Sequence, residues 1–441
     1  MRGIRFLILL AIAIPIGWYA YHDSKKGPLD DSPKHDKAFA VEADKIDELE
    51  IKSESGDRTV LRKKGTDWEI VQPAPATPDQ AAVSGIATNL STLEIQRVVE
   101  ESAADLKEFG LAPPRVEVAF KTGGQQHRLQ IGAKTPTGTE IYAKLADQNK
   151  VFLIGSFVDS TFNRGTFDLR DKTVLKVDRE KVDAIDITTP EHSLRVEKVN
   201  GEWQLKQPAS GRAEFSAVDG LVSRIGSLQM KSEVAPEGGD LKKYGLEKPA
   251  ATVHIRSGSS QATLVVSAAQ AGTAYARDLS RPAVFTIEPS LLDDLKKDPA
   301  EYRQKDLFDA RSFNTTHLDI VRNGQSFTFE KSKVKDKDGK EQEKWRQLAP
   351  TAREVDAAKL EALISAATGA RATGFVDSTA KTGLDKPELT IAMKYDEGKE
   401  ERVTFARTPD SGFAARAGSP GAAKLDTATI DGIVKALEDL K

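Results

Sequence analysis

The sequence predicts an α+β protein: an N-terminal transmembrane helix followed by three tandem repeats, each an antiparallel β-meander with a packed helix and a second strand-rich half. Three observations lead to this prediction. A Trp-x-x-x-x-Pro motif occurs three times, a stretch of helical periodicity follows each copy, and each copy closes on Gly-Leu-x-x-Pro. The length of 441 residues also suits about three domains. The predicted boundaries are 1–21 for the anchor, 22–44 for a linker, and 45–172, 173–305 and 306–441 for the repeats.

The first residues are typical of a segment that enters a membrane. Residues 1–5 are short and basic, and residues 6–21 carry no charge. Roughly 17 residues rising about 1.5 Å each would span about 26 Å, near the lower limit for a bilayer. An uncleaved signal anchor is favoured over a cleaved signal peptide or a buried helix, because the bulky Trp18 stands where cleavage requires a small residue. The two arginines before it favour an N-terminus inside and the bulk of the chain outside.

The linker prediction depends on composition. Residues 22–44 are polar, mix Asp with Lys, and contain Pro28 and Pro33. Such a stretch has too few apolar residues to form a core, so we expect a tether that holds the first repeat away from the bilayer.

Each repeat is expected to begin with a three-stranded meander, which in the first copy covers residues 46–51, 60–63 and 68–71 with turn signals between them. Pro73 ends the meander, and a helix is predicted from about Asp79. The apolar positions of this helix recur at the same offsets from Trp in the other copies: Val83, Ile86, Leu90 and Leu93; Val218, Leu221, Ile225 and Leu228; Leu360, Leu363, Ala367 and Ala370. The third face has smaller side chains, so its packing partner should be closer or bulkier.

The closing motif predicts a turn that leads into a strand. Asp105, Asp240 and Ser378 precede Gly-Leu and can cap a single helical turn through a side-chain oxygen. The Gly can then adopt the left-handed conformation that ends the turn, and the Pro of the motif directs its predecessor to extended structure.

Further strands follow each closing motif, and the third copy carries an insertion. Short helices are expected over residues 290–295 and 427–440. Residues 331–344 are mostly charged and lie where the first repeat has a tight turn before Trp68, so a solvated, extended hairpin loop is predicted. The expected strands cover residues 116–120, 127–131, 141–144 and 151–154; 252–255, 263–266, 274–276 and 283–287; 389–393, 402–405, 412–415 and 422–425.

No motif in the chain predicts chemistry, so no catalytic, cofactor-binding or metal-binding residue is assigned. There is no Cys, and none of the six His is spaced for a helical metal pair. His127 and His254 lie on expected strands at non-equivalent positions and are interpreted as structural or surface residues. Carboxylate pairs such as Asp293 with Asp294, or Asp306 with Asp309, are expected by chance among 67 acids. The Gly-rich stretches match neither a phosphate loop nor a nucleophile elbow.

The charge pattern and the tryptophans also argue against nucleic-acid binding and against an aromatic ligand platform. A net charge of −3 with both signs interspersed predicts no nucleic-acid groove. Trp68, Trp203 and Trp345 could form a ligand platform, but one Trp per repeat at the start of a strand is more typical of a core residue.

An N-terminal anchor, Trp-x-x-x-x-Pro, a helix and an aromatic residue before Gly-Leu-x-x-Pro together resemble the bacterial domain-of-unknown-function family numbered 4340. Thr382 departs from the pattern in the third copy, where an aromatic is usual. The resemblance implies a single-pass protein of the bacterial inner membrane with a periplasmic or extracytoplasmic bulk. It also implies an accessory role at a gliding-type ABC transporter, and no catalytic residue.

The leading functional hypothesis is therefore a non-enzymatic, membrane-anchored scaffold or accessory protein for an ABC-type transporter or envelope assembly. The anchor would raise the local concentration at the membrane, and the repeats would present a long surface. Two alternatives stay open: an envelope hydrolase acting on glycan or peptide, and a ligand-binding module with its site between repeats. Function is expected where the copies differ, in residues 331–344 and on the faces between units.

Overall fold

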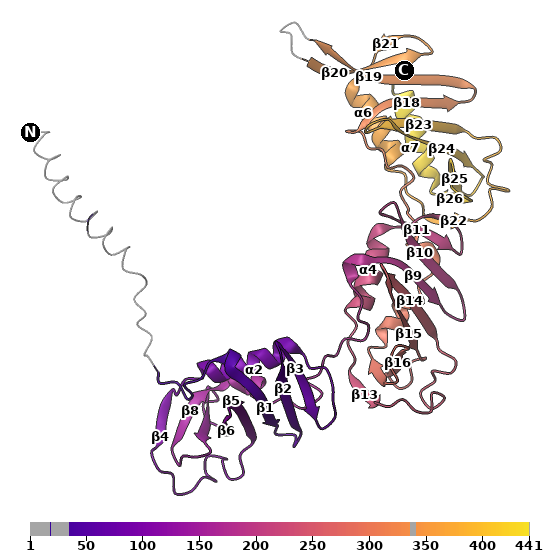
Figure 1. Cartoon of the computed structure of the whole chain (residues 1–441). Coiled ribbons are helices and arrows are strands. Elements are labelled where there is room, and N and C mark those ends of the chain that lie inside the picture. The colour runs from indigo at the N-terminus through magenta and orange to yellow at the C-terminus, as the bar shows by residue number, and fades with distance from the viewer. Residues whose placement is uncertain (1–17, 19–34, 336–340, 441) are drawn as a thin grey trace, which may run out of the picture. The chain divides into compact units, whose positions relative to one another are not determined.

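The computed structural model describes Trp18, residues 35–335 and residues 341–440 (Figure 1). The chain divides into two compact units, Met1–Asp171 and Lys172–Lys441. The first unit holds one antiparallel sheet and the second holds two, so the predicted α+β architecture of three repeated sheet units is confirmed. Apart from Trp18, the predicted anchor lies outside the described residues. Within the described part of the chain, no helix is both long and apolar enough to cross a membrane.

The three sheets share one topology. In each, a meander is joined at its first strand to a second meander, and a short strand closes the far edge. The first sheet has the order β3-β2-β1-β5-β6-β7-β8-β4. Its strands are β1 Ile46–Lys52, β2 Arg58–Lys64, β3 Asp67–Gln72, β4 Arg97–Glu100, β5 Val116–Thr122, β6 Gln125–Lys134, β7 Glu140–Leu145 and β8 Val151–Gly155.

The second sheet has the order β12-β11-β10-β9-β14-β15-β16-β17-β13, and the third β21-β20-β19-β18-β23-β24-β25-β26-β22. The second contains β9 Val182–Thr188, β10 Ser193–Val199, β11 Glu202–Gln207, β12 Gly211–Arg212, β13 Ser232–Ala235, β14 Ala251–Ser257, β15 Ser260–Val266, β16 Ala274–Asp278 and β17 Val284–Ile287. The third contains β18 Thr315–Arg322, β19 Gln325–Lys335, β20 Glu341–Ala349, β21 Arg353–Glu354, β22 Gly374–Val376, β23 Leu389–Tyr395, β24 Lys399–Arg407, β25 Gly412–Arg416 and β26 Ala422–Leu425.

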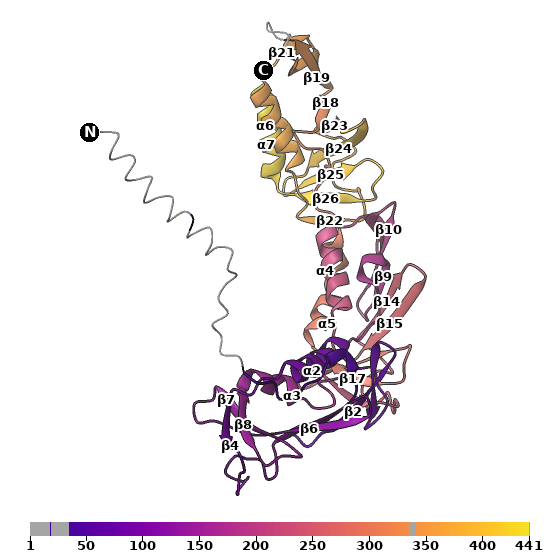
Figure 2. The same ribbon diagram turned by 60° about the vertical axis from the view of Figure 1, so that its left-hand side comes forward.

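One helix follows each meander, and its apolar face is buried as predicted. These helices are α2 Gln80–Thr92, α4 Phe215–Gly226 and α6 Ala357–Thr368. The sequence predicted a closer or bulkier packing partner for the small-residue face of α6. The structure places a second helix, α7 Thr427–Glu438, beside α6 (Figure 2), and α7 contributes Ile430, Ile433 and Leu437 to the same core. The remaining helical segments are η1 Ala43–Lys45, η2 Ser156–Val158, α3 Asp159–Phe162, η3 Arg179–Lys181, α5 Ser290–Leu295 and η4 Pro299–Tyr302.

The repeated Trp residues are core residues, as their positions predict. Trp68, Trp203 and Trp345 are 3–6% exposed. Each pairs across its hairpin with a lysine whose ammonium lies 5.0–6.0 Å from the indole centroid: Lys63, Lys198 and Lys331. A cation over an indole face is attracted by the ring quadrupole. The Lys therefore covers the side of the Trp that the core does not, in all three repeats.

The closing motif forms the predicted capped turn. The Asp105 carboxylate accepts a hydrogen bond from the Lys107 amide at 2.9 Å, and Gly110 has a φ of +65°. The Ser378 hydroxyl accepts the equivalent bond from the Ala380 amide at 3.1 Å. Phe109 packs on Tyr142 with ring centroids 5.1 Å apart, and Tyr244 packs on Tyr275 in the second repeat at 5.2 Å. In the third repeat the buried Thr382 instead donates its hydroxyl proton to the Thr379 carbonyl oxygen.

The packed part of the first repeat begins before the residue that the sequence predicted. Residues 22–34 of the expected linker lie outside the described residues, but Phe39 is buried in the core. The Ala38 amide donates to the Leu93 carbonyl oxygen, and the Ile95 amide donates to that of Asp36, both at 2.8 Å. One aromatic side chain and two backbone hydrogen bonds therefore attach the end of this polar stretch to the first repeat. The polar composition of the stretch gave no indication of this attachment.

The insertion of the third repeat is the exposed, extended hairpin that the sequence predicted, but its two arms are paired strands and not loop. Strand β19 continues to Lys335 and β20 begins at Glu341, and the two remain paired up to these residues. Lys331 and Lys333 bind Glu343 and Glu341 at 2.8 and 4.0 Å across the hairpin. Alternating charges of opposite sign on the two strands stabilise their pairing. A high charge content was therefore a poor indicator of loop structure here.

Candidate functional site at the junction of two repeats

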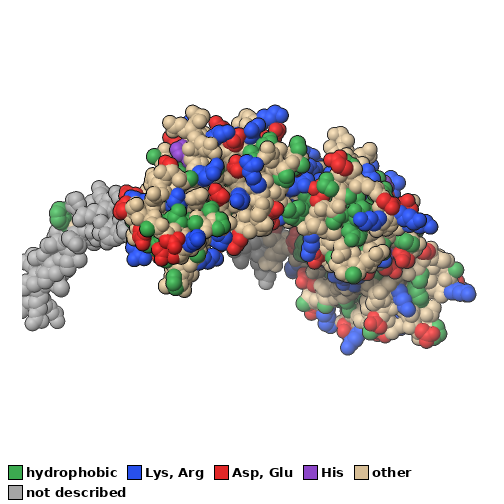
Figure 3. All heavy atoms as spheres, turned by 90° about the horizontal axis from the view of Figure 1, so that it is seen from below, with side chains coloured by type: hydrophobic (Ala, Val, Ile, Leu, Met, Phe, Trp, Pro, Cys, Tyr) green, Lys and Arg blue, Asp and Glu red, His purple; other side chains and the backbone are tan. Residues whose placement is uncertain are grey.

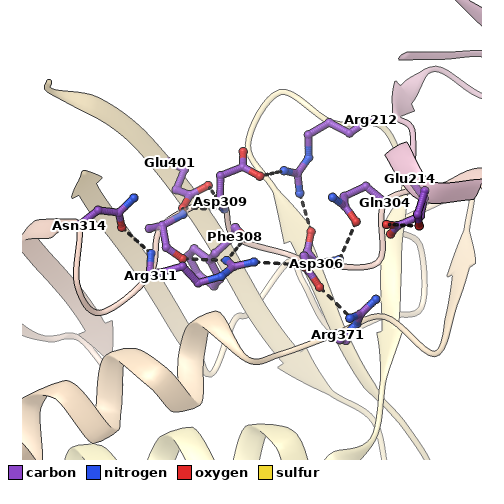
Figure 4. A network of polar contacts seen from close by, with 12 residues as sticks. Arg212, Glu214, Gln304, Asp306, Phe308, Asp309, Arg311, Asn314, Arg371 and Glu401 are labelled. Carbon is purple, nitrogen blue, oxygen red and sulfur yellow. Dashed lines mark hydrogen bonds and ion pairs between the residues drawn. The ribbon is translucent and has the colours of Figure 1, made fainter. Parts of the chain in front are cut away.

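The second and third repeats meet at a cluster of arginines and carboxylates within the second compact unit (Figure 4). We call it the junction cluster: Arg212, Arg303, Asp306, Asp309, Glu401 and Arg416. Arg212 ends the short edge strand β12, and Arg303 follows η4 at the end of the second repeat. Asp306 and Asp309 lie in the connecting segment, whereas Glu401 and Arg416 come from the neighbouring strands β24 and β25.

Backbone pairing positions the connecting segment. The Gln304 amide donates to the Arg212 carbonyl oxygen at 2.9 Å, and the Ala372 amide donates to the Lys305 carbonyl oxygen at 2.8 Å. The first bond ties the segment to the second repeat and the second ties it to the third. Backbone hydrogen bonds to both repeats therefore fix the connecting segment that carries Asp306 and Asp309.

Asp309 is shared between the two repeats. Its carboxylate accepts from Arg212 of the second repeat (Figure 4) and from Arg416 of the third, the latter at 2.9 Å. Burial raises the pKa of Asp309, but the charges of Arg212 and Arg416 outweigh it and hold the pKa below its usual range. The Arg212 guanidinium also donates to the backbone oxygen of Asp306.

Glu401 is a buried carboxylate with its hydrogen-bonding capacity largely used. It is 5% exposed and accepts from the amides of Asp309 and Ala310 at 2.7–3.1 Å. Arg416 lies 3.1 Å from its second oxygen. A buried charge is tolerated where it is paired and hydrogen-bonded. Glu401 thus fixes both the connecting segment and the guanidinium beside it.

Arg303 packs on an aromatic ring of the next repeat. Its guanidinium carbon lies 4.2 Å from the Phe375 centroid, and the group donates to the Pro420 carbonyl oxygen at 3.3 Å. Burial lowers the pKa of Arg303, and the charge of Asp377 opposes this effect. Arg170 occupies the matching position at the end of the first repeat, so an arginine recurs at this junction in the sequence.

Three of the four carboxylates that the sequence suggested as chance pairs, Asp294, Asp306 and Asp309, are ion-paired with cations. Asp306 binds Arg311 at 2.9 Å and Arg371 at 3.2 Å (Figure 4). Asp294 binds Lys297 at 2.8 Å and Arg224 at 3.3 Å. Asp306 and Asp294 each therefore have two cationic partners, as expected of carboxylates with a structural role.

The two histidines on predicted strands occupy different surroundings. His127 stacks on Phe120 with ring centroids 4.9 Å apart. His254 shares a 2.8 Å hydrogen bond with the Thr263 hydroxyl. Within the described ranges, no three His, Cys, Asp or Glu side chains come together as a metal site. On the face drawn in Figure 3, acidic and basic side chains are interspersed.

Sequence comparison assigns the chain to a family that has no described activity. Residues 68–215 and residues 203–387 match the family model described as Domain of unknown function (DUF4340). No curated protein matches the sequence significantly.

Comparison with solved structures gives only weak similarity. The DNA polymerase III subunit beta from Pseudomonas aeruginosa is 7% identical over 88% of this chain and 93% of its own, with a TM-score of 0.17. A DNA polymerase sliding clamp from the same organism is 8% identical with the same coverages and TM-score. At these TM-scores the similarity carries no argument about fold or function.

Proposed function

We propose, from the premise that this chain belongs to the family of domains of unknown function (DUF4340), that it is a non-enzymatic, membrane-anchored extracytoplasmic scaffold or accessory protein. Its partner would be an ABC-type transporter or another complex of the bacterial envelope. The three repeats would present binding surfaces, and the predicted anchor would keep them at a high effective concentration beside the partner.

The observation that carries the proposal is the long hairpin of the third repeat. Lys63 and Trp68 are paired across a tight turn, whereas the equivalent Lys331 and Trp345 are the base of a hairpin that continues to Lys335 and Glu341. The repeats otherwise share their Trp, helix and closing motif, all of which serve the core. A protruding hairpin that the core does not require is a natural place for a partner to bind.

The position of this hairpin in the sheet favours a protein partner. Strand β20 lies next to the sheet edge, and the two-residue strand β21 covers it only at Arg346 and Gln347. The outward edge of residues 343–345 thus lies at the margin of the sheet, where an extended segment of another protein could add by strand pairing. Val334 on the facing strand is 40% exposed and would add apolar contact.

The test is crosslinking of the full chain in bacterial membranes followed by mass spectrometry of the captured proteins. We expect a transporter or envelope component with the unaltered chain. Replacing residues 332–344 by Lys-Gly-Thr-Asp, the turn of residues 64–67, should abolish the capture without unfolding the repeat. A matched control alters only the turn at Asn200 and Gly201 of the second repeat and should retain the partner.

Two results would contradict the proposal at different levels. Capture of the same partner by the shortened variant would show that the hairpin is not the binding element. Recovery of no envelope partner, together with hydrolysis of peptidoglycan or peptides by the purified full chain, would favour the hydrolase alternative.

A further inference from the structure

A small cavity lies inside the junction cluster and is lined by three arginines. It has a volume of about 50 Å³, and its walls include Arg212, Arg303 and Arg416 together with the turn at Ser419–Gly421. A water molecule needs roughly 10–15 Å³ of such volume, so the cavity can hold a few waters or one small ion. The walls come from both repeats, because Arg212 and Arg303 belong to the second and Arg416 to the third.

Positive charge is in excess around this cavity. Three arginines, Arg212, Arg303 and Arg416, line the cavity together with one carboxylate, Asp306. Asp309 lies next to the cavity, where it pairs with Arg212 and Arg416, and Glu401 pairs with Arg416. The Asp377 side chain is 86% exposed and lies 3.9 Å from Arg303, so solvent screens it most. Burial lowers the pKa of Arg212, and the charge of Arg416 lowers it further, although Asp309 opposes both effects. The guanidinium groups therefore repel one another across the cavity.

The arginines also retain hydrogen-bond donors beyond those that the cluster uses. The Arg416 Nη1 atom is buried and has no hydrogen-bond partner among the residues that the structure describes. Arg303 is 9% exposed and, within the part of the chain that the structure describes, donates a single hydrogen bond, to Pro420, although a guanidinium carries five N–H groups. Leaving charged donors buried without an acceptor is unfavourable. The cavity thus offers both charge and donors to an acceptor-only group.

We propose that this cavity binds a small tetrahedral oxyanion of the phosphate or sulfate class, held by Arg303 and Arg416 with Arg212 beside them. The planar fork of a guanidinium matches two oxygens of such an anion at once. The anion would connect the second and third repeats, because its ligands come from both. This inference is independent of the proposed partner binding at the β19–β20 hairpin, since the two sites share no residue.

The experiment is isothermal titration calorimetry of the purified full chain in detergent with inorganic phosphate, and separately with sulfate, at ionic strength matched with chloride. Saturable binding of one phosphate per chain is the expected result. A second arm uses glycerol phosphate, because the oxyanion could be free or part of a larger molecule such as a lipid headgroup. If inorganic phosphate binds and glycerol phosphate does not, the ligand is a free anion. If both bind equally, the site also accepts the phosphate group of a larger molecule.

The decisive variant is Arg303→Met, which keeps an unbranched side chain against Phe375 but removes the charge. We expect phosphate affinity to fall roughly tenfold or more, as for loss of a charge-assisted contact. Arg256→Met, which removes a surface arginine paired with Asp183 in the same repeat, is the control and should bind as the unaltered chain does. Arg303→Lys keeps the positive charge but lacks the planar guanidinium, so it should also bind phosphate more weakly than the unaltered chain. It replaces Arg303→Met if circular dichroism shows that the Arg303→Met variant is unfolded.

Two outcomes would overturn the proposal. One is the same heat for phosphate as for chloride at matched ionic strength, which would indicate that the cavity holds water only. The other is unchanged phosphate affinity in both folded Arg303 variants, which would place any binding elsewhere.

Discussion

Gly65 and Gly110 have nearly the same backbone conformation in very different surroundings. Their φ angles are +67° and +65°, in the left-handed region that disfavours side chains. A Cβ atom at Gly65 would meet no atom within 4 Å, whereas one at Gly110 would lie 2.8 Å from the backbone nitrogen of Ala133. Gly110 belongs to the closing motif, so its turn packs directly against strand β6. Gly110 is therefore required for both conformation and space, whereas a Cβ atom at Gly245, in the second copy, would lie 3.5 Å from Ser267 and only the conformation favours Gly there.

We expect Gly110→Ala to destabilise the first repeat more than Gly65→Ala does. Gly65→Ala should cost about 1–2 kcal/mol for the backbone conformation alone. Gly110→Ala adds displacement of strand β6 and should cost clearly more. Urea unfolding of the two variants separates the effects, and equal losses would show that space at Gly110 is unimportant.

The junction cluster should make stability depend on acid pH. The folded-state pKa of Asp309 lies below its ordinary value of 3.8. A carboxyl with a depressed pKa contributes stability that is present above its unfolded pKa and is lost as pH falls through the folded value. We therefore expect the free energy of unfolding of the second unit to decline as pH falls below about 3.8.

Asp309→Asn tests this assignment by urea unfolding over an acid pH series. The variant should be less stable near neutral pH and should lose less stability on acidification than the unaltered chain. Asp385→Asn changes an exposed carboxylate outside the cluster and serves as the control. The same pH profile for Asp309→Asn and the unaltered chain would exclude Asp309 as a contributor.

At the scale of elements, the two long helices of the third repeat begin differently. The Asp356 carboxylate accepts hydrogen bonds from the amides of Ala358 and Lys359 at 2.9 and 3.3 Å, before the first turn of α6. Asp426 occupies the same position before α7 but makes no such bond. The first amides of a helix have no partner within it, so a capping oxygen stabilises the helix. Identical residues at the two N-caps thus contribute differently.

Asp356→Ala should lower the stability of the third repeat by about 1 kcal/mol, the typical effect of losing an N-cap. Asp426→Ala should have a smaller effect, because only its charge near the helix N-terminus is lost. Thermal unfolding of both variants gives the comparison. A larger loss for Asp426→Ala would reverse the assignment of the caps.

For the whole molecule, the relevant feature is the division into two compact units. The first unit has its own core, built from strands β1–β3 and β5–β8 and helix α2 around residues such as Leu49, Ile86 and Phe120. The third repeat has a separate core that includes Trp345 and helices α6 and α7. Cores that share no residue can lose their packing independently, so two-state behaviour of the full chain is not expected.

Trp68→Ala should therefore affect one transition only. Truncation of a buried Trp costs about 3–5 kcal/mol, and here the loss falls in the first unit. Denaturant unfolding should show an earlier first-unit transition and an unchanged second one. Phe157→Ala removes a side chain that is 73% exposed in the same unit and should change stability by less than about 0.5 kcal/mol. An equal shift of both transitions by Trp68→Ala would show that the units unfold together.

The repeats were predictable from sequence because their signals are local. Trp, the helical apolar face and Gly-Leu-x-x-Pro act through neighbours within one turn, one hairpin or one helix, and all three recur at matching offsets. The short strands β4, β13 and β22 were not predicted, since three or four residues at a sheet edge show no alternation of burial. Phe39 was missed because a single buried aromatic in a polar stretch leaves no periodic pattern.

The junction cluster could only come from the tertiary structure. Arg212 and Arg416 share Asp309 although they lie about 200 positions apart in the chain. Charged side chains are frequent at surfaces, and nothing in their spacing indicates which will be buried together. The recurring motifs and the local hydrophobic periodicity therefore determined the repeats and their elements. The packing of one repeat on the next decided where buried charge gathers, because an ion pair depends on distance in space and not on separation along the chain.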